Sequence, residues 1–268
     1  MAENNSDRDL EVDETNNKFN KTNYQLAVEL EELKNFVLKK VHFVQVPNKW
    51  KLIRCCEHIC KKTNSKCDCV SNERIPLIGD ENIKYIKCGQ SMFGWLTNML
   101  GYRNGVNKRY LVVSENTFNK PTNNSFTFTS FYYEVKFKFE SENNDDIFMM
   151  FGLGVGRELV GFLKNCGIYH NERIEIVSLP SLTFKDGDTY GCGINYSPKK
   201  MSGLSPTHIF FTQNGQLIGK AVKVRNNNYL PFIATKLCSV EANFGNDLTT
   251  KPFKYDISKH IVTDEFYN

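Results

Sequence analysis

The chain has 268 residues, a formal net charge of +4 and 40% hydrophobic residues. This length suits one sizeable domain plus a tail, or two small domains, and the hydrophobic content is typical of a soluble globular protein. The mild charge, with both signs spread along the chain, argues against a strong electrostatic attraction to nucleic acid. The sequence contains no run of about 18 apolar residues, so it predicts no membrane-spanning helix.

The amino-terminal stretch is polar and acidic. Residues 1–21 combine low hydrophobicity with many Asn, Asp and Glu residues, so we predict a disordered tail there. The stretch has neither the basic head nor the apolar run of a secretory signal, which predicts a cytoplasmic protein and leaves a nuclear or exported location open. In a reducing cytoplasm the nine cysteines would be mostly free thiols or metal ligands.

Residues 22–45 are predicted to form a helical extension. Thr22 and Gln25 fit a capping box. Apolar residues then follow at spacings of four, three and four: Leu26, Leu30, Leu33 and Val37. A helix over about 23–40 is therefore expected. Its stripe covers about two heptads, fewer than a coiled coil usually needs, so packing against the adjacent domain is the favoured interpretation and self-association is the alternative.

From Trp50 onward, short apolar runs alternate with turn residues, a pattern typical of a β-sandwich. Twenty Phe and twelve Tyr residues also favour strands over helices. The clearest strand is 133–140, where apolar and charged residues alternate, so one face is expected in the core and the other in solvent. Residues 147–153 are almost continuously apolar and predict a strand buried on both faces. We predict that these two strands pair as a hairpin.

Asn214-Gly215 gives the most specific local signal. The dipeptide lies between two strand-like runs, residues 209–212 and 217–224. Asn-Gly supplies the two positive φ angles of a type I′ turn, which matches the twist of the flanking strands. A β-hairpin is therefore predicted here.

Taken in chain order, several of these segments resemble the SPRY (B30.2-like) family. The resemblance is carried by DGDTYGCGINY at 186–196, IFFTQNGQLIG at 209–219, YLPFIATKL at 229–237, VEANFGND and KPFKYDI within 240–257, FYYEVKF at 131–137 and FGLG at 151–154. It is strongest over 130–257 and weaker over 48–129, where an opening strand pair is expected around Trp50 and residues 85–87. The resemblance implies an all-β fold, an antiparallel β-sandwich of concanavalin-like topology over 48–260, preceded by a short N-terminal α-helix.

The resemblance also implies a function. SPRY proteins bind partner peptides or domains through loops at one edge of the sandwich, which correspond here to 141–146, 197–207 and the turn near Lys236. We therefore expect a non-enzymatic protein–protein interaction module, an adaptor or substrate-recognition protein, that uses no cofactor. The candidate partner-binding residues are Asn143, Asp145, Asp146, Tyr196, Met201, Leu204 and Lys236. For Tyr196, Met201 and Leu204 two orientations are open, outward as anchors or inward to the core.

A second interpretation rests on the cysteine-rich segment 50–70. Thiolate and imidazole groups are ligands that tetrahedral zinc prefers, and the candidates are Cys56, His58, Cys60, Cys67 and Cys69. Basic residues far outnumber acidic ones over 34–66, so the alternative is a basic, zinc-assisted nucleic-acid-binding or regulatory protein. The segment lacks paired C-x₂-C knuckles, and for that reason free thiols are the simpler explanation.

Two further patterns fail to support catalysis. Gly152, Gly154 and Gly156 are spaced as in a phosphate-binding loop, but the G-x-G-x-x-G pattern fails at Arg157 and Leu159. The five histidines are scattered, and none lies in a context that pairs it with a nucleophile. We therefore expect no enzymatic activity.

Overall fold

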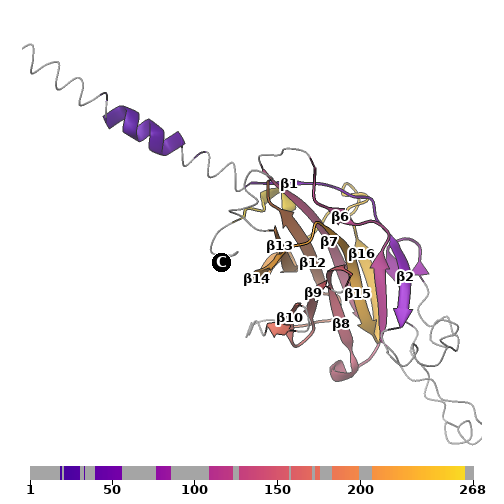
Figure 1. The fold of residues 1–268 in the computed structure, drawn as a ribbon. Coiled ribbons are helices and arrows are strands. Elements are labelled where there is room, and N and C mark those ends of the chain that lie inside the picture. Colours follow the sequence, from indigo (N-terminus) through magenta and orange to yellow (C-terminus); the bar gives the residue numbers. More distant parts are fainter. Residues whose placement is uncertain are drawn as a thin grey trace, which may run out of the picture.

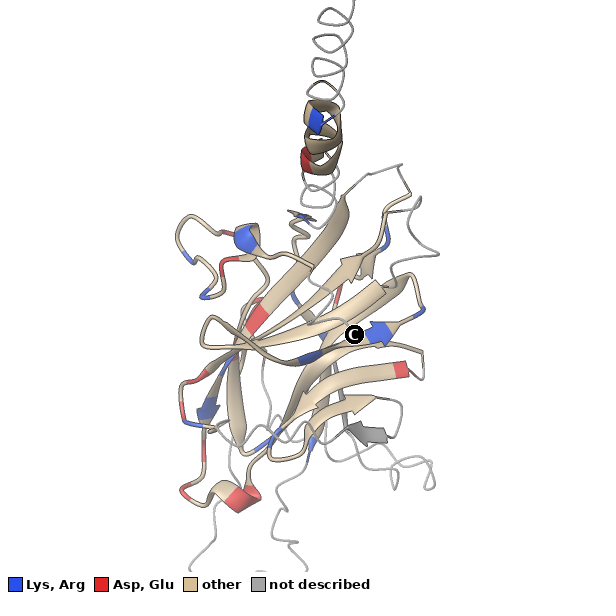
Figure 2. Ribbon diagram, turned by 90° about the vertical axis from the view of Figure 1, so that its left-hand side faces the viewer, with Lys and Arg blue, Asp and Glu red and all other residues tan. Residues whose placement is uncertain are grey.

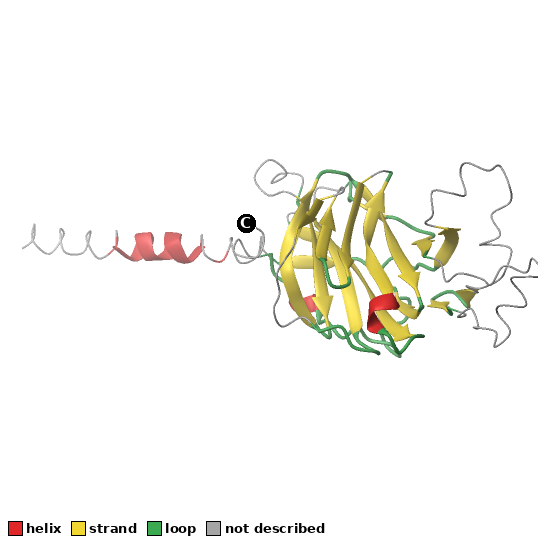
Figure 3. Cartoon of the chain, turned by 90° about the horizontal axis from the view of Figure 1, so that it is seen from below, coloured by secondary structure: helices red, strands yellow, loops and turns green. Residues whose placement is uncertain are grey.

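The computed structural model describes residues 19, 21–30, 33, 40–55, 77–85, 109–122, 127–156, 158–170, 173–175, 183–198 and 207–262. Two β-sheets face each other, and a helix at residues 21–30 stands apart from them (Figures 1 and 3). The predicted fold, an antiparallel β-sandwich with a short N-terminal helix, is confirmed. Of the predicted disordered tail 1–21, residues 1–18 and 20 lie outside the described part of the chain and stay a prediction, whereas Phe19 and Lys21 are helical.

The first sheet has eight strands. Along the sheet they are β14 (Gln216–Val224), β13 (Thr207–Gln213), β12 (Thr189–Tyr196), β7 (Phe128–Phe139), β16 (Cys238–Asn243), β4 (Asn82–Ile83) and β3 (Leu77–Ile78). The eighth, β1 (Val41–Phe43), lies parallel to the beginning of β7. The longest strand, β7, therefore lies in the middle of this sheet.

The second sheet also has eight strands. Along the sheet they are β11 (Arg173–Glu175), β10 (Gly167–His170), β9 (Glu158–Leu163), β8 (Phe148–Val155), β15 (Asn228–Lys236), β5 (Tyr110–Ser114) and β2 (Trp50–Cys55), with β6 (Phe118–Asn119) beside β15. Pro231 lies within β15 opposite Leu153, in the gap between the residues that pair with β6 and those that pair with β5. A proline is tolerated there because that side of the strand needs no donor.

The core lies between the two sheets. Tyr133, Val135 and Phe137 of β7 point into it and are fully buried, and Phe151 of β8 faces them from the other sheet. The Tyr133 hydroxyl donates to the Gly152 carbonyl oxygen at 2.8 Å and accepts from the Gly152 N–H at 3.1 Å. Hydrogen bonds as well as apolar packing therefore hold the sheets together.

The predicted strand at 133–140 is confirmed over 133–139 as part of β7, with one exception to its alternation. Lys136 and Lys138 are exposed as expected, but Glu134 is buried. The reason lies in the C-terminal segment 253–260, whose Ile257 packs with Tyr132 and Phe210 on the outer face of the first sheet. Near its end the segment forms a short 3₁₀ helix, η4 (Ile257–Lys259).

The hairpin at Asn214-Gly215 is confirmed. Gln213 and Gln216 pair across a two-residue turn in which Asn214 has φ 48° and Gly215 has φ 85°. Both angles are positive, as a type I′ turn requires. Local sequence was sufficient for this prediction because the turn chemistry lies entirely within the dipeptide.

The predicted hairpin between 133–140 and 147–153 is wrong. β7 pairs with β12 and β16 in the first sheet, whereas β8 pairs with β9 and β15 in the second. The segment between them crosses from one sheet to the other, and Ile147 is buried in the core at the end of the crossing. The burial of β8 on both faces is confirmed, since only its two terminal residues are partly exposed.

The expected opening strands are found only in part. β2 begins at Trp50 and pairs with β5. Tyr85 lies just after β4 and outside any strand, while residues 86–87 fall outside the described residues.

The helix at residues 21–30 does not pack on the sandwich. Leu26 is 56% exposed, Leu30 55% and Leu33 61%, and Figure 3 shows the helix projecting away from the sheets. The favoured interpretation of the apolar stripe, packing against the adjacent domain, is therefore wrong in this structure.

Candidate functional site

The strands that lead into the three expected partner-binding loops do not all end at the same end of the sandwich. Phe139, at the end of β7, leads into loop 141–146, and Lys236 is opposite Phe148 across the β15–β8 ladder at the same end. Tyr196 pairs with Thr129 at the beginning of β7, so the chain after Tyr196 leaves from the opposite end. Loop 141–146 and Lys236 therefore lie at one end of the sandwich, whereas the chain enters 197–207 from the other end, and residues 199–206 lie outside the described residues.

Tyr196 takes the inward orientation. Its side chain is buried and its hydroxyl donates to the Phe118 carbonyl oxygen at 2.7 Å. Met201 and Leu204 lie outside the described residues, so their role stays a prediction.

Loop 141–146 is shaped by its own hydrogen bonds. Asn143 caps η2 (Asn144–Asp146) by accepting from the Asp145 N–H at 3.1 Å, and its amide donates to the Asp146 carboxylate at 3.3 Å. The Lys164 ammonium donates to the Asn144 carbonyl oxygen. All of these loop side chains are exposed, and Figure 2 shows the acidic residues of η2 at the end of the sandwich opposite the N-terminal helix.

Beside this loop, three hollows follow one another along the outer face of the first sheet. The largest, about 670 Å³, lies at the loop, the next has about 410 Å³ and the last about 130 Å³. Glu140 lines the first two, and Lys136 and Glu241 line the second and third. Because successive hollows share residues, we treat them as one surface and call it the β7–β16 groove.

The middle of the groove combines apolar and basic side chains. Ile78 and Val240 line it together with Lys84, Lys136 and Lys138. Ile78 is 50% exposed, and the aliphatic stems of lysine side chains also present apolar surface while the ammonium groups remain in water. The groove can therefore contact an apolar group and an anionic group at the same time.

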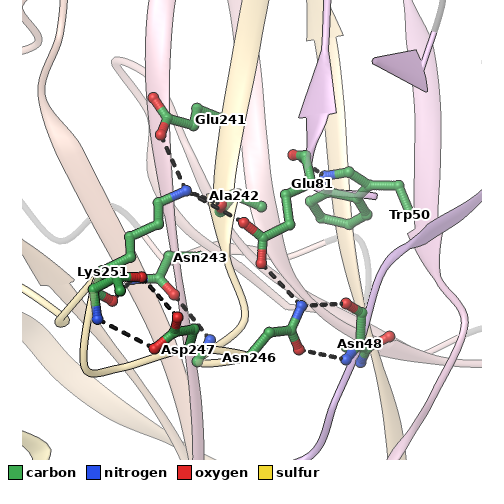
Figure 4. Close-up of polar contacts among 11 residues, drawn as sticks. Asn48, Trp50, Glu81, Glu241, Ala242, Asn243, Asn246, Asp247 and Lys251 are labelled. Atoms are coloured by element: carbon green, nitrogen blue, oxygen red, sulfur yellow. Dashed lines mark hydrogen bonds and ion pairs between the residues drawn. The ribbon is translucent and has the colours of Figure 1, made fainter. Parts of the chain in front are cut away.

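The acidic side chains that line the middle of the groove are already engaged. The Asp186 carboxylate accepts a hydrogen bond from the Phe139 N–H at 2.6 Å. Glu241 is opposite Lys136 across the ladder, but its carboxylate pairs with Lys251 at 3.0 Å, as Figure 4 shows. Glu140 accepts a hydrogen bond from the Ser239 hydroxyl. By contrast, none of the three lysines forms an ion pair with a residue that the structure describes. The available charge in the middle of the groove is therefore positive.

A polar network fixes one side of the groove (Figure 4). The Asn246 amide donates to the Asn48 carbonyl oxygen at 2.8 Å and to Glu81 at 2.9 Å, and Lys251 pairs with Glu81 at 3.3 Å. The Trp50 indole N–H donates to the Glu81 carbonyl oxygen at 2.9 Å. These contacts join segments about 200 residues apart in sequence and hold the groove in a preformed shape.

Sequence reasoning found the groove only in part. The alternation along β7 predicted that Lys136 and Lys138 face outward. Their neighbours Ile78, Lys84 and Glu241 come from strands far away in the chain, and no sequence signal places them beside β7.

A second polar cluster lies under the C-terminal segment. The His260 ring stacks on Phe210 with centroids 4.2 Å apart, its Nδ1 lies 2.6 Å from the Tyr255 hydroxyl oxygen and its Nε2 lies 2.9 Å from the Asn195 amide nitrogen. Because an amide N–H donates, Nε2 accepts, and the proton of the neutral ring resides on Nδ1. A second proton on Nε2 would face the Asn195 amide. Burial lowers the pKa of His260 to about 4.

We expect the free energy of unfolding to fall as the pH is lowered from 6.5 to about 4. The ordinary pKa of His260 is 6.5, so in this window the unfolded chain binds a proton that the folded chain does not. Linkage then makes stability rise with pH through the window. The His260 contribution amounts to at most about 3 kcal/mol, and urea unfolding at a series of pH values measures it.

His260→Gln is the control for this effect because glutamine keeps hydrogen-bonding groups and does not titrate. Burial raises the pKa of Glu134, and that shift acts in the opposite direction, since the folded chain holds the proton at higher pH. The Glu134 contribution is common to both proteins and cancels in their difference. Parallel stability curves for the two proteins would show that His260 does not titrate as the structure predicts.

The described residues contain no group of three or more His, Cys, Asp or Glu side chains placed to hold a metal ion. The zinc candidates Cys56, His58, Cys60, Cys67 and Cys69 all lie outside the described residues, so zinc binding there stays a prediction. Cys166, Cys192 and Cys238 are free thiols. Cys192 and Cys238 are buried, and burial raises the pKa of Cys238 to about 12, whereas Cys166 is only half-buried.

Within the described part of the chain, no helix has the length and apolar character needed to cross a membrane. The class of protein that the structure defines is a two-sheet antiparallel β-sandwich with a preformed groove on one outer face. No protein-family model matches the chain, and no curated protein matches it.

Several solved structures are similar to this chain. The SPRY domain of human HERC1 has 13% identity and a TM-score of 0.32, covering 54% of this chain and 87% of that one. The carbohydrate-binding module CBM66 from Bacillus subtilis has 8% identity and a TM-score of 0.31, covering 52% and 81%. The metal-free lectin I-B4 from Griffonia simplicifolia has 11% identity and a TM-score of 0.30, covering 63% and 91%. These likenesses are distant, and nothing about function follows from them.

Proposed function

We propose that this protein is a non-enzymatic protein–protein interaction module, an adaptor or substrate-recognition protein, that binds a partner segment in the β7–β16 groove. The observation that carries the proposal is the row of Lys84, Lys136 and Lys138, which form no ion pair with any described residue, beside the exposed Ile78. Positive charge without an internal partner favours an acidic ligand.

The shape of the groove supports an extended peptide as that ligand. The hollows follow β7 from Glu134 to Glu140, and a strand advances about 3.3 Å per residue. The surface is therefore about 20 Å long and would accommodate about six extended residues. An acidic segment with one apolar side chain for Ile78 matches its chemistry.

Loop 141–146 and Lys236 would form the rim at the end of the groove. Asn143, the N-cap of η2, and Asp145 and Asp146 within η2 are exposed, and Glu140 connects the hollow at the loop to the middle of the groove because it lines both hollows. In this proposal the carboxylates of Asp145 and Asp146 repel the more acidic end of the bound segment, so that end lies away from the rim. They would therefore set its orientation.

Peptide selection tests the proposal. Peptides selected from a displayed random library on the wild-type protein are expected to be acidic. They should bind Lys136→Glu/Lys138→Glu roughly tenfold or more weakly, because two attractive contacts become repulsive. Fluorescence anisotropy measures the affinities, and the binding should weaken as salt is added.

Lys223→Glu is the matched control because Lys223 is an exposed lysine of β14 in the same sheet, away from the groove. This variant should bind the selected peptides as the wild type does. Equal affinity of the groove variant and the control would place the binding surface elsewhere. The same peptides measured with Asp145→Ala report on the rim.

A further inference from the structure

The N-terminal helix presents an apolar stripe that no part of the described sandwich covers. Phe19 is 65% exposed, Leu26 56%, Leu30 55% and Leu33 61%. These residues recur at spacings of seven, four and three, which are heptad spacings when Phe19, Leu26 and Leu33 occupy d positions and Leu30 an a position. A helix with such a stripe gains most of its stability from packing of the apolar face against a partner.

The register identifies the preceding a position as Asn23. A single asparagine among apolar a positions is a feature of two-stranded parallel coiled coils, because the two amides can pair only when the helices are in register. In sequence, Val37 continues the pattern as the next a position. The repeat from Phe19 to Val37 thus extends beyond the stripe of four residues first seen in the sequence.

The charges beside the stripe favour a second copy of this chain. Glu29 occupies a g position, and by sequence Lys34 occupies the following e position. In a parallel pair of helices, each g side chain faces the e side chain five residues later on the partner, so Glu29 would meet the partner's Lys34 twice. In an antiparallel pair g faces g and e faces e, which would bring like charges together. The pattern therefore favours the parallel arrangement.

We propose that the helix that includes residues 21–30 forms a parallel two-stranded coiled coil with a second copy of this chain. The dimer holds two sandwiches at one end of the coiled coil. A partner with two binding segments would then bind with an avidity that one sandwich cannot supply. This inference does not depend on what the sandwich binds.

Sedimentation equilibrium of the full chain tests the proposal. The wild type is expected to show a concentration-dependent monomer–dimer equilibrium. Leu30→Asp should be monomeric because it places a charge in the apolar seam. Its sandwich should unfold at the same urea concentration as that of the wild type, because the exposed Leu30 supports no contact there.

A charge exchange distinguishes this parallel pairing from other uses of the stripe. Glu29→Lys and Lys34→Glu should each weaken the dimer roughly tenfold or more, since both g–e′ pairs become repulsive. An equimolar mixture of the two variants should restore a heterodimer with wild-type affinity, and added salt should reduce the difference between the variants and the wild type.

Three results would overturn the proposal. A wild-type chain that stays monomeric at all concentrations would show that the stripe has a different occupant. A mixture of the two charge variants that stays monomeric would refute the parallel g–e′ pairing. If the Leu30→Asp chain still dimerises, the dimer contact lies on the sandwich and not on the helix.

Discussion

Gly152→Ala is expected to lower the free energy of unfolding by about 4 kcal/mol, more than overpacking a core usually costs. A Cβ at this position would lie 2.1 Å from the Val160 carbonyl oxygen and 2.6 Å from the Gly161 Cα. Both are backbone atoms of β9, which is hydrogen-bonded to β8 along its length. Neither can move aside unless the ladder opens, so the strain cannot relax through side chains.

Gly156→Ala is the control for this prediction. Gly156 follows the same strand with φ 58°, and a Cβ there would meet nothing within 4 Å. Its substitution should cost only the conformational strain of about 1 kcal/mol. Urea unfolding of both variants measures the two costs. If both variants unfold at the same urea concentration, the contact between β8 and β9 is looser than the structure has it.

The features that could be predicted from the sequence are those set by neighbouring residues. The Asn214-Gly215 turn depends on two φ angles, and the core face of β7 depends on alternation within one strand. Both are confirmed. The order of strand motifs from residue 131 onward also predicted the sandwich correctly.

The features that could not be predicted depend on which distant segments become neighbours. β7 and β8 are adjacent in sequence and strand-like, and a hairpin is the simplest pairing for them. Their real partners are β12, β16, β9 and β15, and this pairing separates the two strands into different sheets. A sequence pattern reports that a strand has a buried face, but it does not report what covers that face.

The same limit applies to the candidate site. Outward-facing residues of β7 could be identified, yet the groove also needs Ile78 and Lys84, which long-range pairing brings beside β16 and β7. Tyr196 illustrates the opposite case. It ends a strand at the start of a long polar loop. Only its contacts with distant residues, the edge-on packing of Phe131 and the hydrogen bond to the Phe118 carbonyl oxygen, determine that its ring points inward.

Glu134→Ala is expected to lower the free energy of unfolding by about 4 kcal/mol. The buried carboxylate accepts hydrogen bonds from the Tyr132 hydroxyl at 3.0 Å, the Lys254 N–H at 3.0 Å and the Tyr255 N–H at 2.9 Å. Each buried donor left without an acceptor costs about 1–3 kcal/mol. Urea unfolding measures the loss, and limited proteolysis should show earlier cleavage within residues 253–262, which the carboxylate holds on the sheet.

Two further variants test whether the loss comes from the hydrogen bonds that Glu134 accepts or from the removal of a negative charge on this face of the sheet. Glu134→Gln keeps one acceptor oxygen and should lie between the wild type and the alanine variant. Glu241→Ala removes a half-exposed carboxylate that pairs with Lys251 on the same face, and it should cost less than about 1 kcal/mol. Equal losses for Glu134→Ala and Glu241→Ala would show that the C-terminal segment is held by its apolar side chains alone. Because Glu134 and Lys254 also line the far end of the β7–β16 groove, release of the segment should weaken peptide binding there as well.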